Sequence, residues 1–339
     1  MPNPALETLM LAFTGELNLP TPPRTLFLGA EPHDTLRDWP NLLGWQPHKP
    51  LAHAWETSGF HRTDAPSGTW PAILQLPGKS RDEVLAGFAN AWEMLEPGGS
   101  LIASMSNTAG AARFEKDLSK AVGGVTSIQK HKCRAFIAVK NHDAPASLPA
   151  DWKSGGERKP VPNTAFIVEA GIFSTGRIDP GSQLLADHLP ASLHGLVADL
   201  GAGWGFLSDA LTRRCPGIRR IDLFEADARA LECAKLNLAH SSTDCRFHWH
   251  DVTRGLTDRY DAIVMNPPFH TGQATDIDLG RAFLKTAAAS LKPGGQLWLV
   301  ANRQLPYEAV LETSGLSWRN LANDGTYKLL RAQSPHSSR

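Results

Sequence analysis

The carboxyl-terminal half of the chain alternates short apolar segments with segments whose apolar residues recur at helical spacing. The short segments predict strands over residues 196–200, 220–224, 246–250, 260–265 and 296–302. The segments between them predict helices over residues 206–214, 228–239 and 278–291, the last one stopped by the sequence KPGG. Strands that alternate with helices in this way indicate βαβ units, so the pattern predicts a doubly wound α/β domain with a parallel sheet.

The amino-terminal half repeats parts of this pattern weakly. Residues 95–101, LEPGGSL, match LKPGGQL at an offset of 196 residues; 26–30 resemble 198–202 at an offset of 172; and 72–77 correspond to 262–267 at an offset of 190. Any two α/β domains can share Pro-Gly-Gly turns, but here the order and the spacing agree as well as the composition. We interpret the three pairs as an internal duplication.

The two halves are separated by a segment rich in Pro, Gly, Ser and Lys that has no sustained apolar period. Such a composition is typical of a linker. We therefore expect an amino-terminal domain over residues 1–150, a linker over 151–163 and a carboxyl-terminal domain over 164–333.

The composition is that of a globular protein with a neutral total charge. The 339 residues include 34 Lys or Arg and 34 Asp or Glu, and 42% are hydrophobic. This mixture excludes a disordered or generally basic chain. Basic residues gather locally, in residues 130–160 and in the cluster Arg213, Arg214, Arg219 and Arg220. Each group is either a solvated surface or a set of contacts to nucleic-acid phosphates.

Other features of the sequence bear on the compartment and on metals. Four cysteines lack CxxC or Cys/His ligand spacing, which predicts free thiols and no metal site: Cys133, Cys215, Cys233 and Cys245. The first twenty residues do not resemble a signal peptide. No uncharged apolar run approaches the roughly 18 residues that would span a bilayer. We expect a cytoplasmic protein that contains no metal and does not associate with a membrane.

The first candidate for chemistry is the segment DLGAGWG, residues 199–205, which ends a predicted strand and begins a helix. Its glycines, Gly201, Gly203 and Gly205, allow a tight turn and the close approach of a ligand. The spacing is GxGxG, and Phe206 stands where a dinucleotide fingerprint has its third glycine, which argues against NAD or FAD.

Two carboxylates follow the next two predicted strands. Glu225 lies about 20 residues past the glycines, where this fold places a carboxylate that binds ribose hydroxyls. Asp251 is placed to accept a hydrogen bond from an adenine amino group, or else serves as a helix N-cap. The sequence leaves both roles of Asp251 open.

The strongest signal is Asn266-Pro267-Pro268-Phe269, directly after the predicted strand 260–265. The prolines restrict the backbone, so the Asn266 side chain and the Pro267 carbonyl group point in fixed directions. Both can accept hydrogen bonds from one planar NH2 group, and Phe269 offers a face for stacking on a planar ring. The alternative is a plain turn, but a plain turn seldom begins with Asn and ends with an aromatic residue at this place. We predict that this segment binds an exocyclic amine.

Together these motifs resemble those of class I S-adenosylmethionine-dependent methyltransferases. Three features resemble more closely the bacterial small-subunit ribosomal RNA guanine-N2-methyltransferase family: NPPFH at 266–270, VANRQLPY at 300–307, and GIFS with DPGSQLL within 171–185. The resemblance extends over residues 165–331. The related large-subunit guanine-N2-methyltransferase family has a similar layout, and the motifs do not separate the two.

The resemblance implies an α/β fold of two tandem Rossmann-like methyltransferase domains, of which the amino-terminal one is degenerate and the carboxyl-terminal one catalytic. It implies S-adenosylmethionine as cofactor and ribosomal RNA or the small ribosomal subunit as partner of a monomeric enzyme. The implied cofactor-binding residues are Asp199, Gly201, Gly203, Gly205, Glu225, Asp251 and Asn266. The implied catalytic residues are Asn266, Pro267 and Phe269. The implied substrate-binding residues are Pro268, Phe269, His270 and Arg303.

Within that set, the glycines approach the methionine part of the cofactor, Asp199 supports its amino group, Glu225 the ribose and Asp251 the adenine. Asn266 and Pro267 hold the guanine N2 amine. Trp204 is bulky for a glycine loop. The amino-terminal half retains only Gly29 of the loop and has Leu76 in place of Asn266, so we expect a scaffold or RNA platform that binds no cofactor.

Other functions remain open alternatives to guanine-N2 methylation. The methylated NH2 group could be adenine N6 or a release-factor glutamine, or the protein could be an RNA-binding module without catalysis.

Overall fold

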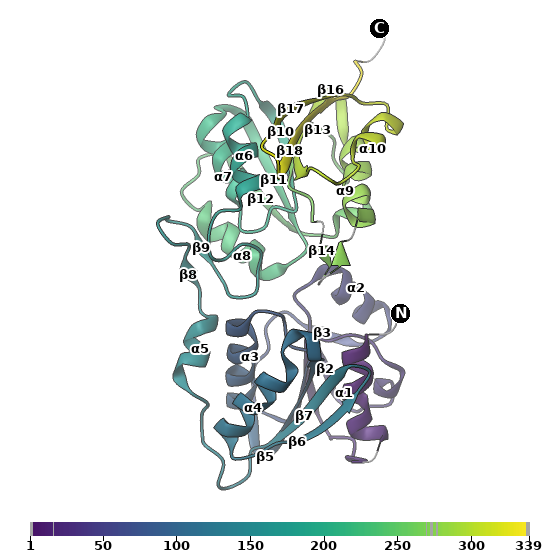
Figure 1. Cartoon of the computed structure of the whole chain (residues 1–339), viewed down its shortest axis with the longest axis vertical. Helices are drawn as coiled ribbons and strands as arrows, with labels where there is room; N and C mark the ends of the chain where they lie inside the picture. Colours follow the sequence, from purple (N-terminus) through teal and green to yellow (C-terminus); the bar gives the residue numbers. More distant parts are fainter. Residues whose placement is uncertain (1–2, 16, 269, 272–273, 276, 337–339) are drawn as a thin grey trace. The chain divides into compact units, whose positions relative to one another are not determined.

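The computed structural model describes residues 3–15, 17–268, 270–271, 274–275 and 277–336. The chain forms two compact units, Met1–Arg158 and Lys159–Arg339 (Figure 1). The boundary lies within the segment 151–163 that the sequence predicts as a linker. Part of that segment is helical: α5 (Ala150–Gly156) packs against α3 (Arg81–Glu93) and buries Trp152.

The first unit contains a seven-stranded sheet in the order β3-β2-β1-β4-β5-β7-β6. Its strands are β1 (Thr25–Leu28), β2 (Leu42–Trp45), β3 (His61–Thr63), β4 (Trp70–Gln75), β5 (Leu95–Ser106), β6 (Thr126–Lys130) and β7 (Cys133–Val139). Its other helices are α1 (Pro4–Thr14), α2 (Lys49–Thr57) and α4 (Ala111–Val122), with short 3-10 turns η1 (Asp34–Leu36) and η2 (Asn107–Ala109).

The second unit contains a seven-stranded sheet in the order β12-β11-β10-β13-β16-β18-β17. These strands are β10 (His194–Leu200), β11 (Gly217–Glu225), β12 (Asp244–Trp249), β13 (Tyr260–Met265), β16 (Leu291–Asn302), β17 (Ser317–Asn323) and β18 (Tyr327–Gln333). The helices are α6 (Pro180–His188), α7 (Phe206–Arg214), α8 (Ala228–Asn237), α9 (Ile277–Ala289) and α10 (Glu308–Thr313), with the 3-10 turn η3 (Val252–Arg254). Two small pairs, β8 (Lys159–Pro160) with β9 (Ile167–Val168) and β14 (His270–Thr271) with β15 (Ala274–Thr275), complete the unit.

The predicted tandem domains are confirmed by strand order and by register. In each sheet the first five strands are parallel and the last two antiparallel. The pairing of β4 with β5 shifts between Trp70 and Ala72, and that of β13 with β16 shifts between Tyr260 and Ala262. Both shifts lie opposite a Pro-Gly-Gly turn. The offsets of 190 and 196 residues found in the sequence therefore join equivalent positions of two related sheets.

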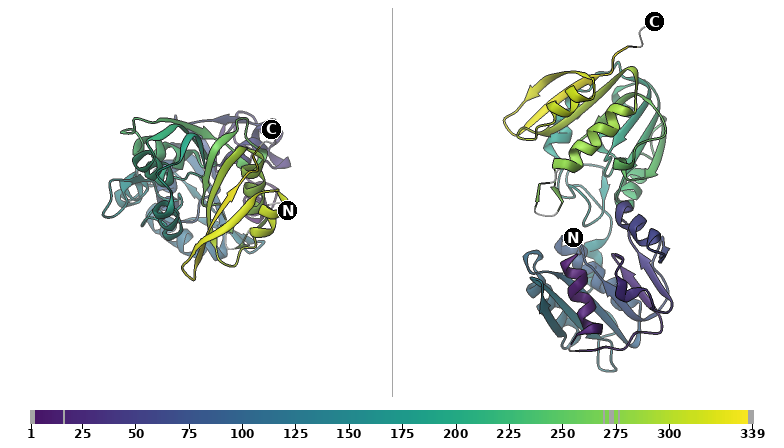
Figure 2. Two further views of the ribbon diagram at one scale, coloured as in Figure 1. Left: turned by 90° about the horizontal axis from the view of Figure 1, so that it is seen from above. Right: turned by 90° about the vertical axis from the view of Figure 1, so that its right-hand side faces the viewer.

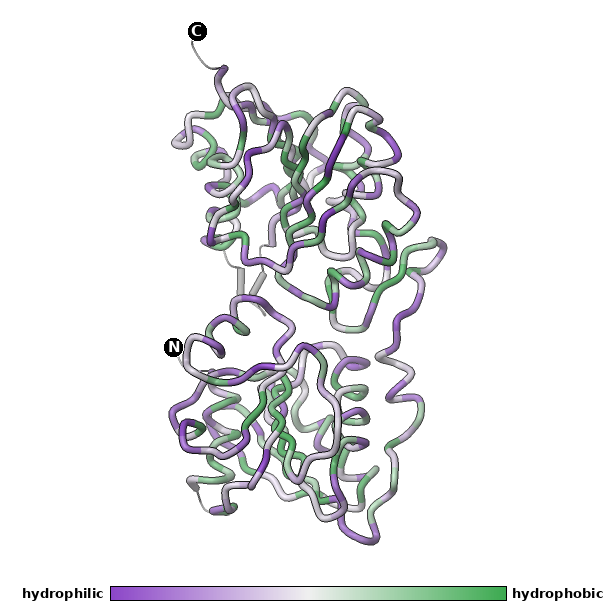
Figure 3. Tube along the Cα trace, turned by 180° about the vertical axis from the view of Figure 1, so that it is seen from behind, coloured by the Kyte–Doolittle hydropathy of each residue, from purple (hydrophilic) through white to green (hydrophobic). Residues whose placement is uncertain are grey.

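Each sheet is buried on both faces, as expected for mostly parallel sheets. In the second unit α6, α7 and α8 pack on one face, and α9 and α10 pack on the other. Ala198 and Leu200 of β10 contact the second group, whereas Val197 contacts the first, because successive side chains alternate across a strand. Figure 2 shows the helices on both sides of each sheet, and Figure 3 shows hydrophobic residues concentrated along the central strands.

Some details differ from the prediction. The sequence predicts a parallel sheet, but β17 and β18 add an antiparallel hairpin at its edge. The helix predicted over 278–291 ends at Ala289, and β16 begins at Leu291 and includes the turn that follows. Among the helices of the described residues, none combines the length and the apolar character needed to cross a membrane.

Candidate active site

Most of the predicted site residues gather at one edge of the second sheet. Asp199 is the penultimate residue of β10, Glu225 ends β11, and Asp251 follows β12 by two residues. Asn266 comes directly after β13, and Arg303 directly after β16. Because these five strands are parallel, their carboxyl ends meet at the edge where α/β sheets bind ligands. The structure thus brings the strand ends that carry these candidates to one edge of the sheet.

The glycine loop joins β10 to α7 through left-handed backbone angles. Gly201 has φ +73°, and its N–H donates to the Phe224 carbonyl oxygen at 2.9 Å. Gly203 has φ +54°, and a Cβ added there would meet no heavy atom within 4 Å. At Gly205, φ is +90° and an added Cβ would lie 3.2 Å from the Ala234 Cβ of α8. Gly205 therefore allows α7 and α8 to pack closely, a different role from the ligand approach that the sequence predicts.

Trp204 is accommodated beside the loop. Its side chain is buried, and the indole Nε1–H donates to the Phe173 carbonyl oxygen at 3.1 Å. Its ring packs against Phe166, with centroids 5.0 Å apart, and against Phe206, with centroids 5.8 Å apart. The bulk of this side chain is taken up by a hydrophobic cluster, although Trp204 also lines the small cavity described below.

Asn237, which the sequence does not single out, anchors the glycine loop through hydrogen bonds. This side chain is buried at the end of α8. Its Nδ2 donates to the carbonyl oxygens of Trp204 at 2.8 Å and Ile167 at 2.9 Å, and its Oδ1 accepts from the Ile167 N–H at 2.6 Å. One side chain therefore fixes both the glycine loop and strand β9.

Asp199 is a fully buried carboxyl group with one unpartnered oxygen. Its Oδ2 accepts from the Ser208 hydroxyl at 2.7 Å, whereas Oδ1 has no hydrogen-bond partner among the described residues. Burial raises the pKa of Asp199 to about 7 against the lowering effect of Ser208, and the nearby Glu225 charge adds to the rise. A buried acceptor without a partner favours a ligand that brings a donor or a positive charge.

Glu225 caps the glycine loop. Its Oε2 accepts from the Gly203 N–H at 2.7 Å, and its Oε1 accepts from the Asp227 N–H at 2.8 Å. Burial raises the pKa of Glu225, while these two backbone hydrogen bonds lower it. A carboxylate oxygen can accept more than one hydrogen bond, so both Glu225 oxygens can still accept from a ligand hydroxyl.

Asp251 is the N-cap of η3. Its Oδ1 accepts from the Thr253 N–H at 3.0 Å and from the Thr253 hydroxyl at 2.6 Å. Of the two roles that the sequence left open, the structure displays the helix cap, a role that uses Oδ1 and leaves Oδ2 for any ligand.

The Asn266 side chain is oriented by two residues at the amino-terminal end of α6. Its Nδ2 donates to Asp179 Oδ2 at 2.8 Å and to Ser182 Oγ at 2.9 Å. Asp179 is also the N-cap of α6, accepting from the Ser182 N–H at 2.8 Å. Asp179 and Ser182 belong to the segment DPGSQLL, one of the features of the family resemblance, but the sequence alone indicates no role for them. Asp followed by Pro and, three positions on, by Ser is a helix-start signal that could have drawn attention to them.

The remaining predicted residues have varied placements. Pro267 is buried and Pro268 is half-buried. Arg303 is exposed, and its backbone N–H donates to the Thr326 carbonyl oxygen at 2.9 Å. The predictions for Phe269 and for the His270 side chain lie outside the described residues.

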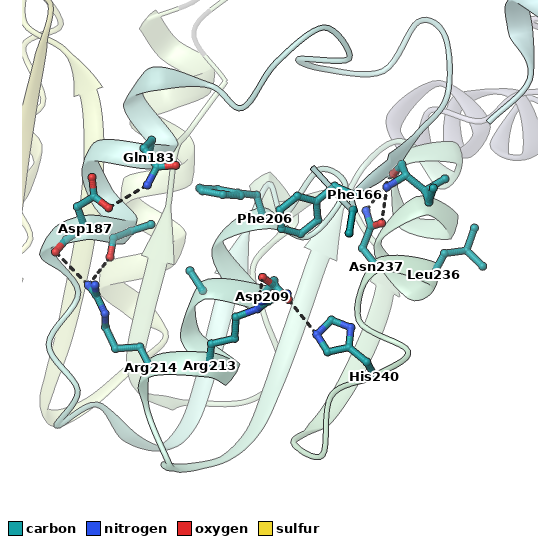
Figure 4. Close-up of a pocket in the computed structure, with 14 residues that line it drawn as sticks. Phe166, Gln183, Asp187, Phe206, Asp209, Arg213, Arg214, Leu236, Asn237 and His240 are labelled. Carbon is teal, nitrogen blue, oxygen red and sulfur yellow. Dashed lines mark hydrogen bonds and ion pairs between the residues drawn. The ribbon is translucent and has the colours of Figure 1, made fainter. Parts of the chain in front are cut away.

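A small cavity of about 50 Å³ lies between the glycine loop, the start of α6 and Asn266. It is lined by Gly201 and Gly203 of the loop, by Asp179 and Ser182, and by Asn266. A larger hollow of about 690 Å³ lies over α6, α7 and α8 (Figure 4). Its lining includes Arg213 and Arg214 of the second basic cluster but none of the predicted catalytic, cofactor-binding or substrate-binding residues. The small cavity, and not the larger hollow, is the candidate active site.

The second basic cluster is largely paired. Arg213 lies 2.8 Å from Asp209, and Arg214 donates to the backbone carbonyl oxygens of Ala186 and Asp187 in the last turn of α6 (Figure 4). Arg214 also donates to the carbonyl oxygen of Leu189, directly after this helix. Arg220 pairs with the buried Asp222 at 2.8 Å. In the first unit three basic side chains of residues 130–160 are also engaged by carboxylates or carbonyl oxygens: Arg134, Lys140 and Lys153. These pairs favour a structural role for much of both groups.

The sheet order, the glycine loop and the Asn-Pro-Pro turn at the carboxyl edge define a methyltransferase of the Rossmann-like class. The family model described as "Methyltransferase small domain" matches residues 163–331. The ribosomal RNA small subunit methyltransferase C of Pseudomonas aeruginosa (strain LESB58) is 33% identical over 320 residues, which cover 91% of this chain and 94% of that protein. The chain belongs to the ribosomal RNA small subunit methyltransferase C family.

Two further comparisons help to delimit the relationship. The solved structure of the T. thermophilus 16S rRNA N2 methyltransferase (RsmC), in complex with AdoMet and guanosine, superposes with a TM-score of 0.82 at 25% identity and covers 98% of this chain and 92% of that one. The ribosomal RNA large subunit methyltransferase G of Alcanivorax borkumensis is 36% identical over 177 residues, covering 51% of this chain and 45% of that protein.

Proposed function

We propose that this protein transfers a methyl group from S-adenosylmethionine to the exocyclic N2 amine of a guanine in 16S ribosomal RNA. The observation that carries the proposal is Asn266, at the carboxyl edge of the sheet. Its Nδ2 is occupied by Asp179 and Ser182, so its Oδ1 is the atom available to accept from an amine. The solved relative of matching length contains AdoMet and guanosine.

The residues present fit S-adenosylmethionine. The unpartnered Asp199 Oδ1 suits a cationic amino group, and Glu225 retains lone pairs for ribose hydroxyls. Asp251 would accept from the adenine amino group through Oδ2. Gly201 and Gly203 line the small cavity with no side chain in the way. Gly205 contributes through the packing of α7 on α8.

S-adenosylmethionine supplies an electrophilic methyl group. The task of this chain is to aim a nitrogen lone pair at that group. A guanine N2 amine is conjugated with its ring and is a poor nucleophile. Hydrogen bonds from the amine to the Asn266 Oδ1 and the Pro267 carbonyl oxygen favour a nitrogen whose lone pair is available. Proximity and fixed orientation supply much of the acceleration. The N–CH3 bond forms as the S–CH3 bond breaks, which leaves S-adenosylhomocysteine, and the methylated nitrogen then loses its extra proton to solvent. No general base is therefore required before attack.

The target guanine must be unstacked to reach this edge of the sheet, either because it lies in a loop or because it is flipped out. Phe269, Pro268, His270 and Arg303 are the proposed contacts to the base and its neighbours. The first unit serves as scaffold or RNA platform, and the enzyme acts as a monomer in the cytoplasm on ribosomal RNA or the small subunit.

Large-subunit RNA is the second candidate, because the motifs alone do not separate the two families. The lengths of the similarities favour the small subunit: the relative named for the small subunit aligns over 91% of this chain, and the one named for the large subunit over 51%. Adenine N6 and a release-factor glutamine present the same NH2 group and are further alternatives.

A methyl-transfer assay with radiolabelled S-adenosylmethionine tests the proposal. The substrates are unmodified small subunits, unmodified large subunits, the two naked RNAs and a release factor. We expect label in 16S RNA, recovered after digestion as N2-methylguanosine. Label in large-subunit RNA, in N6-methyladenosine or in the release factor would overturn the assignment in favour of the corresponding alternative.

A further inference from the structure

We propose that Asp179 and Ser182 are positioning residues that fix which end of the Asn266 amide faces the substrate. This inference rests on the proposed function, in which the Asn266 Oδ1 accepts from the guanine amine. It adds to that function a device that makes the Asn266 side chain present an acceptor and never a donor.

The geometry places two acceptors on one side of Asn266. Asp179 Oδ2 and Ser182 Oγ lie 2.8 Å and 2.9 Å from Nδ2, so both amide hydrogens are used. All three residues line the same small cavity. Asp179 and Ser182 lie 87 and 84 residues before Asn266 in the chain; Asp179 is the N-cap of α6 and Ser182 lies in its first turn.

An ionised carboxylate can only accept hydrogen bonds, which makes the orientation one-way. If the amide turned over, Asn266 Oδ1 would face the Asp179 carboxylate, and two acceptors would oppose each other. The amine of the substrate would then meet the Nδ2 hydrogens, and two donors would oppose each other there. Both mismatches disfavour the same flipped state, so Asp179 and Ser182 together select the orientation in which Asn266 Oδ1 faces the substrate amine.

The first turn of α6 is itself rigid. Pro180 follows the Asp179 cap, and Asp179 Oδ2 accepts from the Ser182 N–H at 2.8 Å in addition to the Asn266 amide. An added Cβ at Gly181 would lie 2.9 Å from the Tyr327 ring of β18, so this turn sits closely against the sheet. A turn held in this way keeps the two acceptors in place before any ligand arrives.

Exchanging donor and acceptor tests the inference. Asn266→Asp places a carboxylate against Asp179 and should lose at least 100-fold in kcat. Asp179→Asn keeps a good N-cap but removes the one-way acceptor, and should lose about tenfold in kcat with KM changed by less than threefold. In the double variant the Asn introduced at 179 can donate to the Asp introduced at 266, which still presents an acceptor to the amine. We expect it to be at least tenfold more active than Asn266→Asp.

Ser182→Ala provides a second variant, expected to lose threefold to tenfold in kcat, and Gln183→Ala, on the exposed side of the same helix, is the matched control, expected to keep wild-type kcat. S-adenosylmethionine affinity and melting temperature are measured for every variant, so that loss of folding is seen directly. The inference is overturned if the double variant is folded and no more active than Asn266→Asp, or if Ser182→Ala matches Gln183→Ala. If the wild type itself fails to make N2-methylguanosine, the proposed function fails instead.

Discussion

Gln46 in the first unit occupies the position that Glu225 occupies in the second. Leu28 pairs with Trp45 and Leu200 pairs with Phe224, and the residue after each partner is Gln46 or Glu225. The Glu225 carboxylate accepts from the glycine loop. The Gln46 amide instead donates through Nε2 to the Ala30 carbonyl oxygen at 3.0 Å. Where the second unit has a carboxylate that can bind ligand hydroxyl groups, the first unit thus has an amide whose N–H group is used within the loop after β1.

The first prediction is that the full chain binds one S-adenosylmethionine. In the first unit Phe27 stands at the position of Asp199, Leu76 at that of Asn266 and Gln46 at that of Glu225. Calorimetry on the full chain should give a stoichiometry near one. Calorimetry on residues 1–158, a compact unit with its own core, should give no binding. A stoichiometry of two, or binding by the shorter chain, would show that the first unit retains a site.

The second prediction concerns the amine. Asn266→Ala removes the side-chain acceptor while leaving the glycine loop intact. Methyl transfer should fall by about 10²–10³-fold, the usual cost of losing one positioned hydrogen-bonding group at a reacting centre. S-adenosylmethionine affinity, measured by calorimetry, should stay within a few-fold. Full turnover by this variant would exclude the assigned role.

The third prediction concerns Glu225→Gln. An amide offers one acceptor where the structure uses two, so one of the Gly203 and Asp227 N–H groups would face a donor. We expect S-adenosylmethionine affinity to fall at least tenfold, with a fall in the melting temperature because the loop is less well held. Equilibrium dialysis and thermal unfolding measure the two effects. Unchanged affinity would mean that Glu225 has only a structural part.

The fourth prediction is a dependence on pH. The pKa of Asp199 is raised to about 7 in the free protein, above the value of 3.8 for an unperturbed carboxyl group. The folded state therefore binds this proton more tightly than the unfolded state. Its contribution to stability is greatest at low pH and is lost as the pH rises from about 4 to about 7. Asp199→Asn should abolish this loss. The unfolding free energy of the variant minus that of the wild type should therefore increase as the pH rises over the same range.

Binding should show the opposite trend. A cationic amino group favours the ionised carboxylate, so the affinity of the wild type for S-adenosylmethionine should rise about five- to tenfold between pH 6 and pH 7.5. Asp199→Asn should bind more weakly and with little dependence on pH. Calorimetry in two buffers of different ionisation enthalpy would detect the proton released. A flat wild-type profile would contradict this role of Asp199.

The fifth prediction concerns stability. Asn237→Ala removes three hydrogen bonds, so the buried Trp204 carbonyl oxygen and the part-buried backbone groups of Ile167 lose these partners. We expect a loss of about 2–4 kcal/mol in unfolding free energy, measured by urea denaturation. Asn320→Ala, at an exposed position of β17, is the control and should change stability by less than about 0.5 kcal/mol. Equal effects of the two would show that the Asn237 contacts add little.

The periodicity of the sequence predicts the central strands and their helices because burial on a parallel sheet leaves a strong apolar signal. The bounds predicted for β13 and α7 agree with the structure. Strand β17 was missed, since it is an edge strand whose side chains are all exposed or half-buried and give a weak pattern. Strand β18 is mostly buried, but it is antiparallel and follows the last βαβ unit, so the alternation of strands and helices does not predict it. The motif spacing likewise predicts the edge at which the site lies.

What the sequence could not supply is distance across the fold. The contact between Asp179 and Asn266 spans 87 residues, and no local pattern reports it. The three glycines of GxGxG look alike in sequence, yet Gly203 faces open space while Gly205 faces Ala234. Only the position of α8 in the folded protein shows that Gly205 serves helix packing while Gly203 leaves space open.

The register shift shared by the two sheets has a consequence for the comparison of the two units. It persists at Trp70 and Ala72, in a unit whose counterparts of Asp199 and Asn266 are apolar. The shift therefore occurs in a sheet with or without these polar residues, and it belongs to the fold and not to the chemistry of the site. The first unit is thus an internal reference for the second. A feature that both units share at equivalent positions can be explained by the common fold, and the polar residues found only in the second unit are the ones that need a chemical explanation.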